Sequence, residues 1–361
     1  MKIRSVFLVA FLLLFPTLTL LPNAQAQSNQ NIILVEPPHR DFQGNFFVDG
    51  FADSLTPAGS LGLKVFSPSP SPRTWLMDPA LIDDVEALAK KNVDAQNWLA
   101  QLKSVSLIDS VIAVPYAHPD LSLLKRLAPN ELNYYFDYSK MKLQVFLGRD
   151  VTIDKTAKWF KGKAKISSDA AMAYTYNRRA LVLMSTVVPQ DQLDEFRSKL
   201  ACLLSEGNSK SRQSDLATSA GLALTDARHK LRIVGGNYRL TSSREKIPVT
   251  LVNDFDTPIS VKLHLTVQNS RIKVGKVEQV TLAAKSKTQV FLPITVNVSG
   301  TTTILAEFRN SSGRTINDVS IFSINSSVIS PAVAWFTTGS AIILFLAAIA
   351  QSVRRVRRSR K

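Results

Sequence analysis

Five side chains in the first half of the chain have types and spacing that could support chemistry: Asp78, Tyr116, His118, Asp120 and Asp150. All five follow short apolar runs that predict strands, and in α/β folds the reactive groups gather outside the carboxyl ends of strands. Two facing carboxylates could act as acid and base on a glycosidic bond. His118 with Asp120 could instead hold a metal-bound water that hydrolyses an amide or ester.

Two of these aspartates also have a structural interpretation. Asp78 precedes Pro79 and Asp120 follows Pro119, which are positions typical of residues that cap the start of a helix. Such a cap accepts a backbone N–H and stabilises by about 1 kcal/mol. We favour capping over catalysis for both residues, so the sequence leaves enzymatic activity open and leans against it.

The elements expected to position these residues alternate between strand and helix. Apolar runs at 74–77, 111–114, 142–147 and 181–187 predict strands, and amphipathic periodicity at 80–105, 120–127 and 192–204 predicts helices. This alternation indicates an α/β domain over residues 73–206, with a mainly parallel sheet that is either open or a partial barrel. Four strands are too few for a closed eight-stranded barrel.

The flanking regions differ from this pattern. Residues 27–72 are predicted as an irregular lead-in that ends in a Pro/Ser connector, and the Ser-rich stretch 207–230 as an exposed linker. From 231 to 326 the period becomes alternating, which predicts an immunoglobulin-like β-sandwich. Its seven expected strands are 231–240, 248–252, 259–267, 272–282, 289–298, 302–308 and 319–324.

Both ends of the chain carry membrane signals. Residues 1–26 have the charged start, apolar run and small-residue site of a signal peptide. Residues 332–353 are apolar enough for a transmembrane helix, and the tail 354–361 carries six cations. Because cytoplasmic flanks are rich in Lys and Arg, we expect a single-pass membrane protein with its N-terminus extracytoplasmic and its C-terminus cytoplasmic.

Composition and the absence of several motifs exclude some classes of function. The formal charge is +16, but the tail holds six of these charges and the leader two, so eight remain outside and nucleic acid is excluded as a partner. The chain has no Gly-rich phosphate loop, no His-Glu-x-x-His, no Gly-x-Ser-x-Gly and no cysteine pair. We therefore predict no cofactor and no metal site, and Cys202 as a buried apolar residue.

Four stretches resemble a known family: TWLMDPALIDDV at 74–85, AVPYAHPDLSLL at 113–124, PVTLVNDFDTPISVKLHL at 248–265, and the apolar helix with its arginine-rich tail. Together they are similar to the actinobacterial membrane proteins of domain-of-unknown-function family 6049, over roughly residues 70–361. The resemblance implies a secreted, single-span cell-envelope protein, often encoded beside the lipid II flippase, with no established reaction. The chain is an abridged form, and His118 stands where the family pattern has an aspartate.

Three functions fit these features. The first is an envelope protein that binds peptidoglycan, another anionic wall polymer or an envelope-biogenesis partner. The second is a degenerate polysaccharide or peptidoglycan hydrolase, or a deacetylase-like enzyme. The third is an accessory subunit of a multi-span membrane protein such as the flippase, in which the small residues of 337–340 would form a close-packing helix face.

Overall fold

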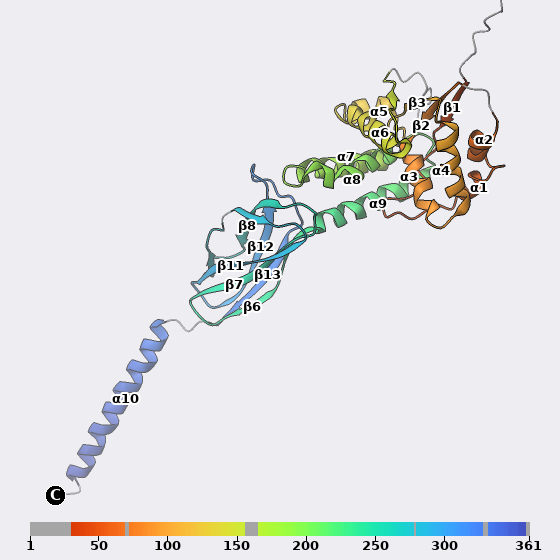
Figure 1. Ribbon diagram of the computed structural model, residues 1–361. Coiled ribbons are helices and arrows are strands. Elements are labelled where there is room, and N and C mark those ends of the chain that lie inside the picture. The colour runs from red at the N-terminus through yellow and green to blue at the C-terminus, as the bar shows by residue number, and fades with distance from the viewer. Residues whose placement is uncertain (1–29, 69–71, 156–164, 278, 328–330, 359–361) are drawn as a thin grey trace, which may run out of the picture.

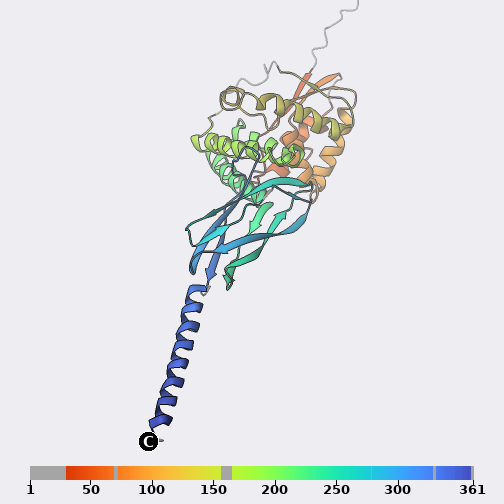
Figure 2. The ribbon, with the colours of Figure 1, turned by 90° about the vertical axis from the view of Figure 1, so that its left-hand side faces the viewer.

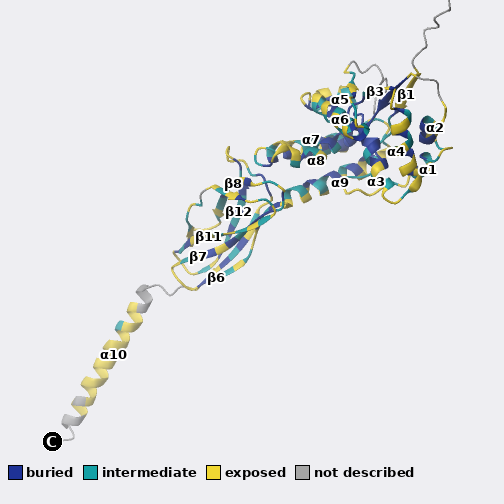
Figure 3. Cartoon of the chain, viewed as in Figure 1, coloured by how far each residue is buried: buried dark blue, intermediate teal, exposed yellow. Residues whose placement is uncertain are grey.

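The computed structural model describes residues 30–68, 72–155, 165–277, 279–327 and 331–358. The expected signal peptide and part of the Pro/Ser connector lie outside these ranges. Figures 1 and 2 show an elongated molecule with an α/β domain at one end, a β-sandwich in the middle and a long helix at the other end. Figure 3 shows that buried residues concentrate around the parallel sheet and its facing helices.

The α/β domain is built on a four-stranded parallel sheet with the order β1-β2-β3-β4. The strands are β1 (Gln30–Leu34), β2 (Arg73–Met77), β3 (Ser110–Ala113) and β4 (Thr152–Ile153). Their order in space follows their order in sequence, as in one side of a β/α barrel. β2 and β3 are the strands expected at 74–77 and 111–114, whereas β1 lies in the stretch expected to be irregular.

Helices connect the strands and cover the sheet. They are α1 (Phe51–Ser54), α2 (Ser60–Phe66), α3 (Pro79–Ala89), α4 (Val93–Val105), α5 (Leu121–Leu127), α6 (Glu131–Leu147), α7 (Ser168–Met184) and α8 (Asp194–Lys199), with 3-10 turns η1 (Gln190–Gln192) and η2 (Leu200–Leu204). A compact core forms between the sheet and α1 to α4 with the end of α6, and it contains the fully buried Trp75 and Trp98.

Two predicted strands are wrong. Residues 142–147 form the end of α6, where Leu143 and Phe146 continue the buried stripe that begins at Tyr135. Residues 181–184 are the last turn of α7, in which Leu181 and Met184 follow Tyr174 on one buried face. A short apolar run fits both periods, and here packing across a longer helix decided the outcome.

The predicted linker 207–230 is also wrong, since it forms the 20-residue helix α9 (Lys210–His229). The Ser209 hydroxyl caps it by accepting from Arg212 N at 3.2 Å. Leu216, Ala220 and Leu224 recur every four residues and are buried, and α9 packs against α7 and η2. The helix runs from the α/β domain to the sandwich (Figure 1) and belongs to one continuous apolar cluster that includes both.

The β-sandwich prediction is confirmed by two facing sheets. One has the order β10-β8-β12-β13-β6 and the other β5-β7-β11-β9. The strands are β5 (Leu231–Val234), β6 (Asn237–Leu240), β7 (Arg244–Asn253), β8 (Ile259–Val267), β9 (Ile272–Val274), β10 (Gln279–Leu282), β11 (Ser286–Val296), β12 (Gly300–Arg309) and β13 (Ser320–Ser326). All pairs are antiparallel except β13 with β6.

Two of the seven expected strands are each divided between the sheets. Gly235 and Gly236 separate β5 from β6, and a Cβ at Gly235 would lie 2.5 Å from the Ile321 carbonyl oxygen. Gly275 follows β9 where a Cβ would lie 2.6 Å from Cγ of Pro293. Because only glycine allows such close approach, the chain changes sheets at these points.

Beyond the sandwich lies helix α10 (Pro331–Arg358). Its window Trp335–Ser352 has a mean hydropathy of 1.4, and none of it is buried against the rest of the protein. Figure 3 shows α10 as mostly exposed. A helix of this length and composition is compatible with a membrane anchor.

Candidate functional site

The carboxyl edge of the parallel sheet brings Asp78 and His118 together. Asp78 Oδ1 accepts from Ala80 N and Ala117 N, both at 2.9 Å, and its Oδ2 lies 3.0 Å from His118 Nδ1. Burial raises the pKa of Asp78, although these hydrogen bonds oppose the shift. The predicted capping role is therefore present, since Asp78 begins α3 and also fixes the loop after β3.

His118 is held in a tight turn. Ala117 and His118 have φ values of 55° and 32°, a region that non-glycine residues rarely occupy. His118 Nε2 lies 3.2 Å from the Glu206 carbonyl oxygen, and its side chain is 6% exposed. The imidazole thus connects α3 to the segment after η2, and its position favours a structural role over attack on a substrate.

The Asp120 and Asp150 carboxylates form hydrogen bonds other than those of the Asp78–His118 pair. Asp120 Oδ1 accepts from Leu123 N at 2.8 Å, so it is the N-cap of α5, as the alternative interpretation predicted. Asp150 was expected after a strand, but it follows helix α6 and precedes β4. It therefore lies at the amino edge of the sheet, where it is mostly exposed and bonds to Gln144 at 2.5 Å. Its assignment to the site is wrong.

Tyr116 is part of a network that the sequence did not reveal. Its hydroxyl donates to Asp83 Oδ2 at 2.9 Å, and Asp83 Oδ1 also pairs with Lys142 Nζ at 2.7 Å. Burial, together with the neighbouring Asp83, raises the pKa of Tyr116 well above its ordinary value. A buried phenol that remains protonated is a hydrogen-bond donor here and a poor base.

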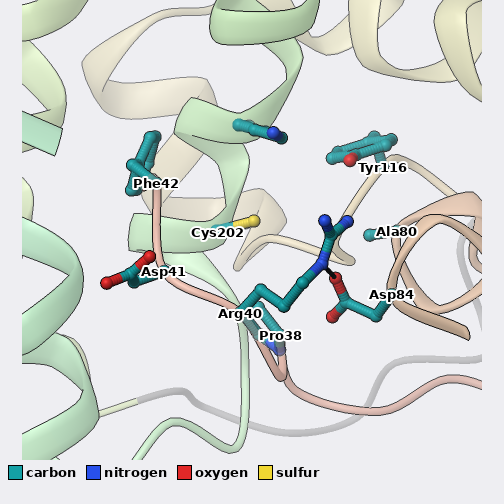
Figure 4. Close-up of a pocket in the computed structure, with 9 residues that line it drawn as sticks. Pro38, Arg40, Asp41, Phe42, Ala80, Asp84, Tyr116 and Cys202 are labelled. Atoms are coloured by element: carbon teal, nitrogen blue, oxygen red, sulfur yellow. Dashed lines mark hydrogen bonds and ion pairs between the residues drawn. The ribbon is translucent and has the colours of Figure 1, made fainter. Parts of the chain in front are cut away.

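The centre of the network is Arg40, which follows β1 (Figure 4). Arg40 Nε pairs with Asp84 Oδ1 at 2.7 Å, its Nη2 donates to the Asp83 carbonyl at 2.9 Å, and Asp84 Oδ2 accepts from His39 N at 2.8 Å. Burial raises the pKa of Asp84, and Arg40 opposes this shift. We call this set of bonds the Arg40–Asp84 latch, because it fastens the segment after β1 to α3.

A narrow recess lies around the latch. Arg40 reaches toward Asp84, with Tyr116 and Cys202 beside it (Figure 4). Only about 20 Å³ of this recess can be reached by the centre of a water molecule, so it has room for one or two waters. Cys202 is buried as predicted, and burial raises the pKa of its thiol, which makes it unreactive.

A second cluster follows the same strand. His39 Nδ1 lies 2.7 Å from Asp49 Oδ2, which also pairs with Arg212 Nη2 at 2.7 Å, and the His39 ring stacks on Phe51 with centroids 3.8 Å apart. His39 Nε2 is buried and has no hydrogen-bond partner among the described residues. Within the described part of the chain, no three His, Cys, Asp or Glu side chains are grouped to hold a metal ion.

An opening larger than the recess lies between the α/β domain and the sandwich, and we call it the interdomain groove. About 260 Å³ of it is accessible to the centre of a water molecule, more than ten times the volume in the recess. Three aromatic rings line it, and Phe42 meets Phe196 edge-on at 5.9 Å. Residues from four segments face it: Phe42 and Gln43 after β1, Gln192, Leu193, Glu195, Phe196 and Lys199 around α8, Ala223, Asp226, Ala227 and Lys230 around α9, and Phe255 after β7.

The latch and the groove do not follow from the sequence prediction because two elements, β1 and α9, are absent from it. Both depend on residues 38–43, which follow β1, and β1 was taken as part of an irregular lead-in. The available signal was the apolar run 32–35, followed after Glu36 by two prolines, which is the pattern of a short buried strand and its exit. The contribution of α9 was missed because 207–230 was taken as a linker.

Comparisons with known proteins bear on the family. The family model described as "Family of unknown function (DUF6049)" matches residues 138–361, a shorter stretch than the 70–361 expected. A search of curated proteins finds no match.

Several solved structures are similar to part of the chain. They include WR4, an MSP family member from C. elegans (TM-score 0.21, 9% identity, 27% of this chain and 98% of that one). A FixG-related protein from Vibrio parahaemolyticus has a TM-score of 0.22 at 8% identity, covering 27% and 94%. The PapD-like domain 7 of human CEP192 has a TM-score of 0.22 at 12% identity, covering 28% and 85%. Scores this low carry no information on function.

Proposed function

Since the chain belongs to DUF6049, a family of unknown function, we propose its role from its geometry: a membrane-anchored cell-envelope protein that binds a ligand in the interdomain groove without turning it over. The observation that carries this proposal is that the recess at the carboxyl edge and the interdomain groove differ in open volume and in the bonding of their charged side chains. The acidic and basic groups of the carboxyl edge are bonded to one another in a recess that admits one or two waters. The groove is open, and ligand sites are commonly found where two domains meet.

The groove has the chemistry to hold a wall fragment. Phe42 and Phe196 supply flat apolar faces of the kind on which sugar rings and apolar side chains pack. Asp226 and Lys230, one helical turn apart at the end of α9, offer both signs of charge. Peptidoglycan combines sugar rings with peptide amines and carboxylates, so we infer that it, or a related wall polymer, is the ligand class.

The test compares two charge pairs on the same helix. Asp226→Asn with Lys230→Gln removes two charges that face the groove, whereas Asp215→Asn with Lys210→Gln removes two exposed charges from the opposite part of α9. We expect the first pair to weaken binding of the full chain to purified peptidoglycan fragments about tenfold or more, and the control pair to leave it unchanged. Equal affinities for the two double variants would contradict the groove assignment.

The hydrolase alternative is tested beside this. Asp78→Asn, His118→Ala and Asp120→Asn are each assayed for release of sugar or peptide fragments and for melting temperature. Removing a true acid–base residue would lower turnover about 10²–10⁴-fold while the fold persists. If the wild type releases fragments and all three variants fail to do so with unchanged melting, catalysis replaces binding.

The membrane topology is part of the same proposal. With α10 as the anchor, residues 27–330 would lie outside the cell and the cationic tail inside. Protease added to intact cells should then remove the ectodomain and leave a tag on the tail protected. Protection of the ectodomain would contradict this orientation.

A further inference from the structure

The end of the sandwich from which the chain continues to α10 can be defined by strand register. β13 ends at Ser326, which pairs with Gly300 and Leu240, and Ser327 N still donates to the Leu240 carbonyl at 2.9 Å. The turns 241–243, 268–271 and 297–299 lie at this same end, because Arg244 and Lys273 both pair with Thr295. Pro331 is four peptide steps beyond Ser327, a reach of at most about 14 Å.

Five exposed cations gather at this end: Arg239, Arg244, Lys246, Arg271 and Lys273, which we call the cationic end. Among the residues that the structure describes, none of the five forms an ion pair, and Arg271 Nη1 donates only to the Ser299 carbonyl, at 2.8 Å. The nearest acidic residue in sequence is Glu245, which is half-buried on the inner face of β7. Val298 lies in the turn between β11 and β12 with 58% of its surface exposed.

The opposite end of the sandwich is different. There Arg232 pairs with Asp254, Lys285 pairs with Asp256 at 3.1 Å, and Arg309 pairs with Glu307. The two ends therefore differ in their ion pairs: three cations at the opposite end have carboxylate partners, and none of the five at the cationic end has one among the described residues. The cationic end therefore presents clustered positive charge with little carboxylate beside it, which can attract an anionic surface.

We propose that the cationic end contacts anionic lipid headgroups of the bilayer that α10 spans. The reach from Ser327 to Pro331 is at most about 14 Å, and the screening length at physiological salt is about 8 Å, so this short connection allows cations at this end to come within electrostatic range of the headgroups. Val298 can enter the headgroup region between them. This contact would hold the sandwich upright on the membrane and set the distance of the interdomain groove from it.

The experiment uses the full chain in lipid nanodiscs made of phosphatidylcholine with or without phosphatidylglycerol. A fluorophore on Val298→Cys reports contact through quenching by headgroup spin-labelled lipid, and the wild type, whose Cys202 is buried, serves as the labelling blank. We expect stronger quenching in the anionic discs, and its loss at 1 M salt, where the screening length falls to about 3 Å.

Charge variants locate the effect. Arg244→Gln, Lys246→Gln and Lys273→Gln together should lower the ratio of lipid-contacting to free states about fivefold for each cation removed. The matched control, Lys262→Gln, Lys287→Gln and Arg314→Gln, removes three exposed cations nearer the opposite end and should keep the quenching. Equal quenching in neutral and anionic discs, or equal loss in both triple variants, overturns the proposal. A response to soluble glycerol phosphate polymer with no quenching in anionic discs assigns the cations to wall polymer and also overturns it.

Discussion

At the carboxyl edge of the parallel sheet Arg40 and Asp84 are largely buried and bonded to each other, whereas in the interdomain groove Asp226 and Lys230 face water. Both places hold acidic and basic side chains, and both include residues that follow β1. Charges in the first place stabilise the fold, because each has a partner that replaces lost hydration. In the second place Asp226 and Lys230 form no ion pair among the described residues and remain available to a ligand. The distinction is in burial and bonding, and residue type alone does not reveal it.

The strongest test of this contrast is Arg40→Ala. It leaves the Asp84 carboxylate buried without its ion pair, and we expect the free energy of unfolding to fall by about 3 kcal/mol or more. Urea denaturation followed by the fluorescence of Trp75 and Trp98, both fully buried in the same domain, measures the loss. Replacing both partners, as Arg40→Met with Asp84→Leu, should recover most of the stability. A loss below 1 kcal/mol would show that Asp84 is free for another role.

Asp78 gives the next largest effect. Asp78→Ala removes the acceptor for two buried backbone N–H groups, and we expect a loss of about 2 kcal/mol. Asp78→Asn keeps an oxygen for Ala80 N and Ala117 N, so its loss should be smaller. The same denaturation measurement compares the two variants. Equal losses would indicate that the charge on Asp78, and not its capping geometry, stabilises the fold.

A pH series sharpens this result. Burial raises the pKa of Asp78 in the folded state above the ordinary value of 3.8. At a pH between 3.8 and the raised pKa, the folded state therefore binds more protons than the unfolded state. Stability should therefore fall as pH rises through this window, by up to about 1.4 kcal/mol per pH unit. Asp78→Asn does not titrate, and its stability should depend less on pH there. An identical slope in both proteins would place the pH dependence on Asp84, whose pKa is also raised.

The sequence predicted the elements whose signals are local. Strands β2 and β3, the caps Asp78 and Asp120 and the alternation of the sandwich all depend on neighbours a few residues away. Helix α9 depends on α7 for its burial, since its composition is polar and Ser-rich. Residues 142–147 were misread because the stripe that makes them helical begins at Tyr135.

The site was predicted only in part for a related reason. Asp78 and His118 follow two recognised strands, so their meeting at the carboxyl edge could be expected. Arg40 and Asp84 are 44 residues apart, and their contact requires β1 to lie beside β2. The groove requires four separate parts of the chain to converge. Pairings of this range are set by tertiary packing, and single-sequence periodicity does not encode them.

The smallest effect on stability is expected in the groove. Asp226→Asn and Lys230→Gln alter exposed side chains, and the only side-chain hydrogen bond of Asp226 within the described residues is a 3.3 Å contact from Gln43. We expect the free energy of unfolding to change by less than about 0.5 kcal/mol for either variant, as is usual for surface positions. The same urea denaturation measures it, with Asp215→Asn as the control on α9.

A small change in the free energy of unfolding would distinguish the charges of the interdomain groove from those at the carboxyl edge of the sheet. If both groove variants keep their stability and lose ligand, the charges act on a partner and not on the fold. If either one destabilises the protein as much as Asp78→Ala does, the junction between α9 and the sandwich is itself a structural latch. The main role of this region would then be to join the two domains through their continuous apolar cluster, and the binding site would have to lie elsewhere.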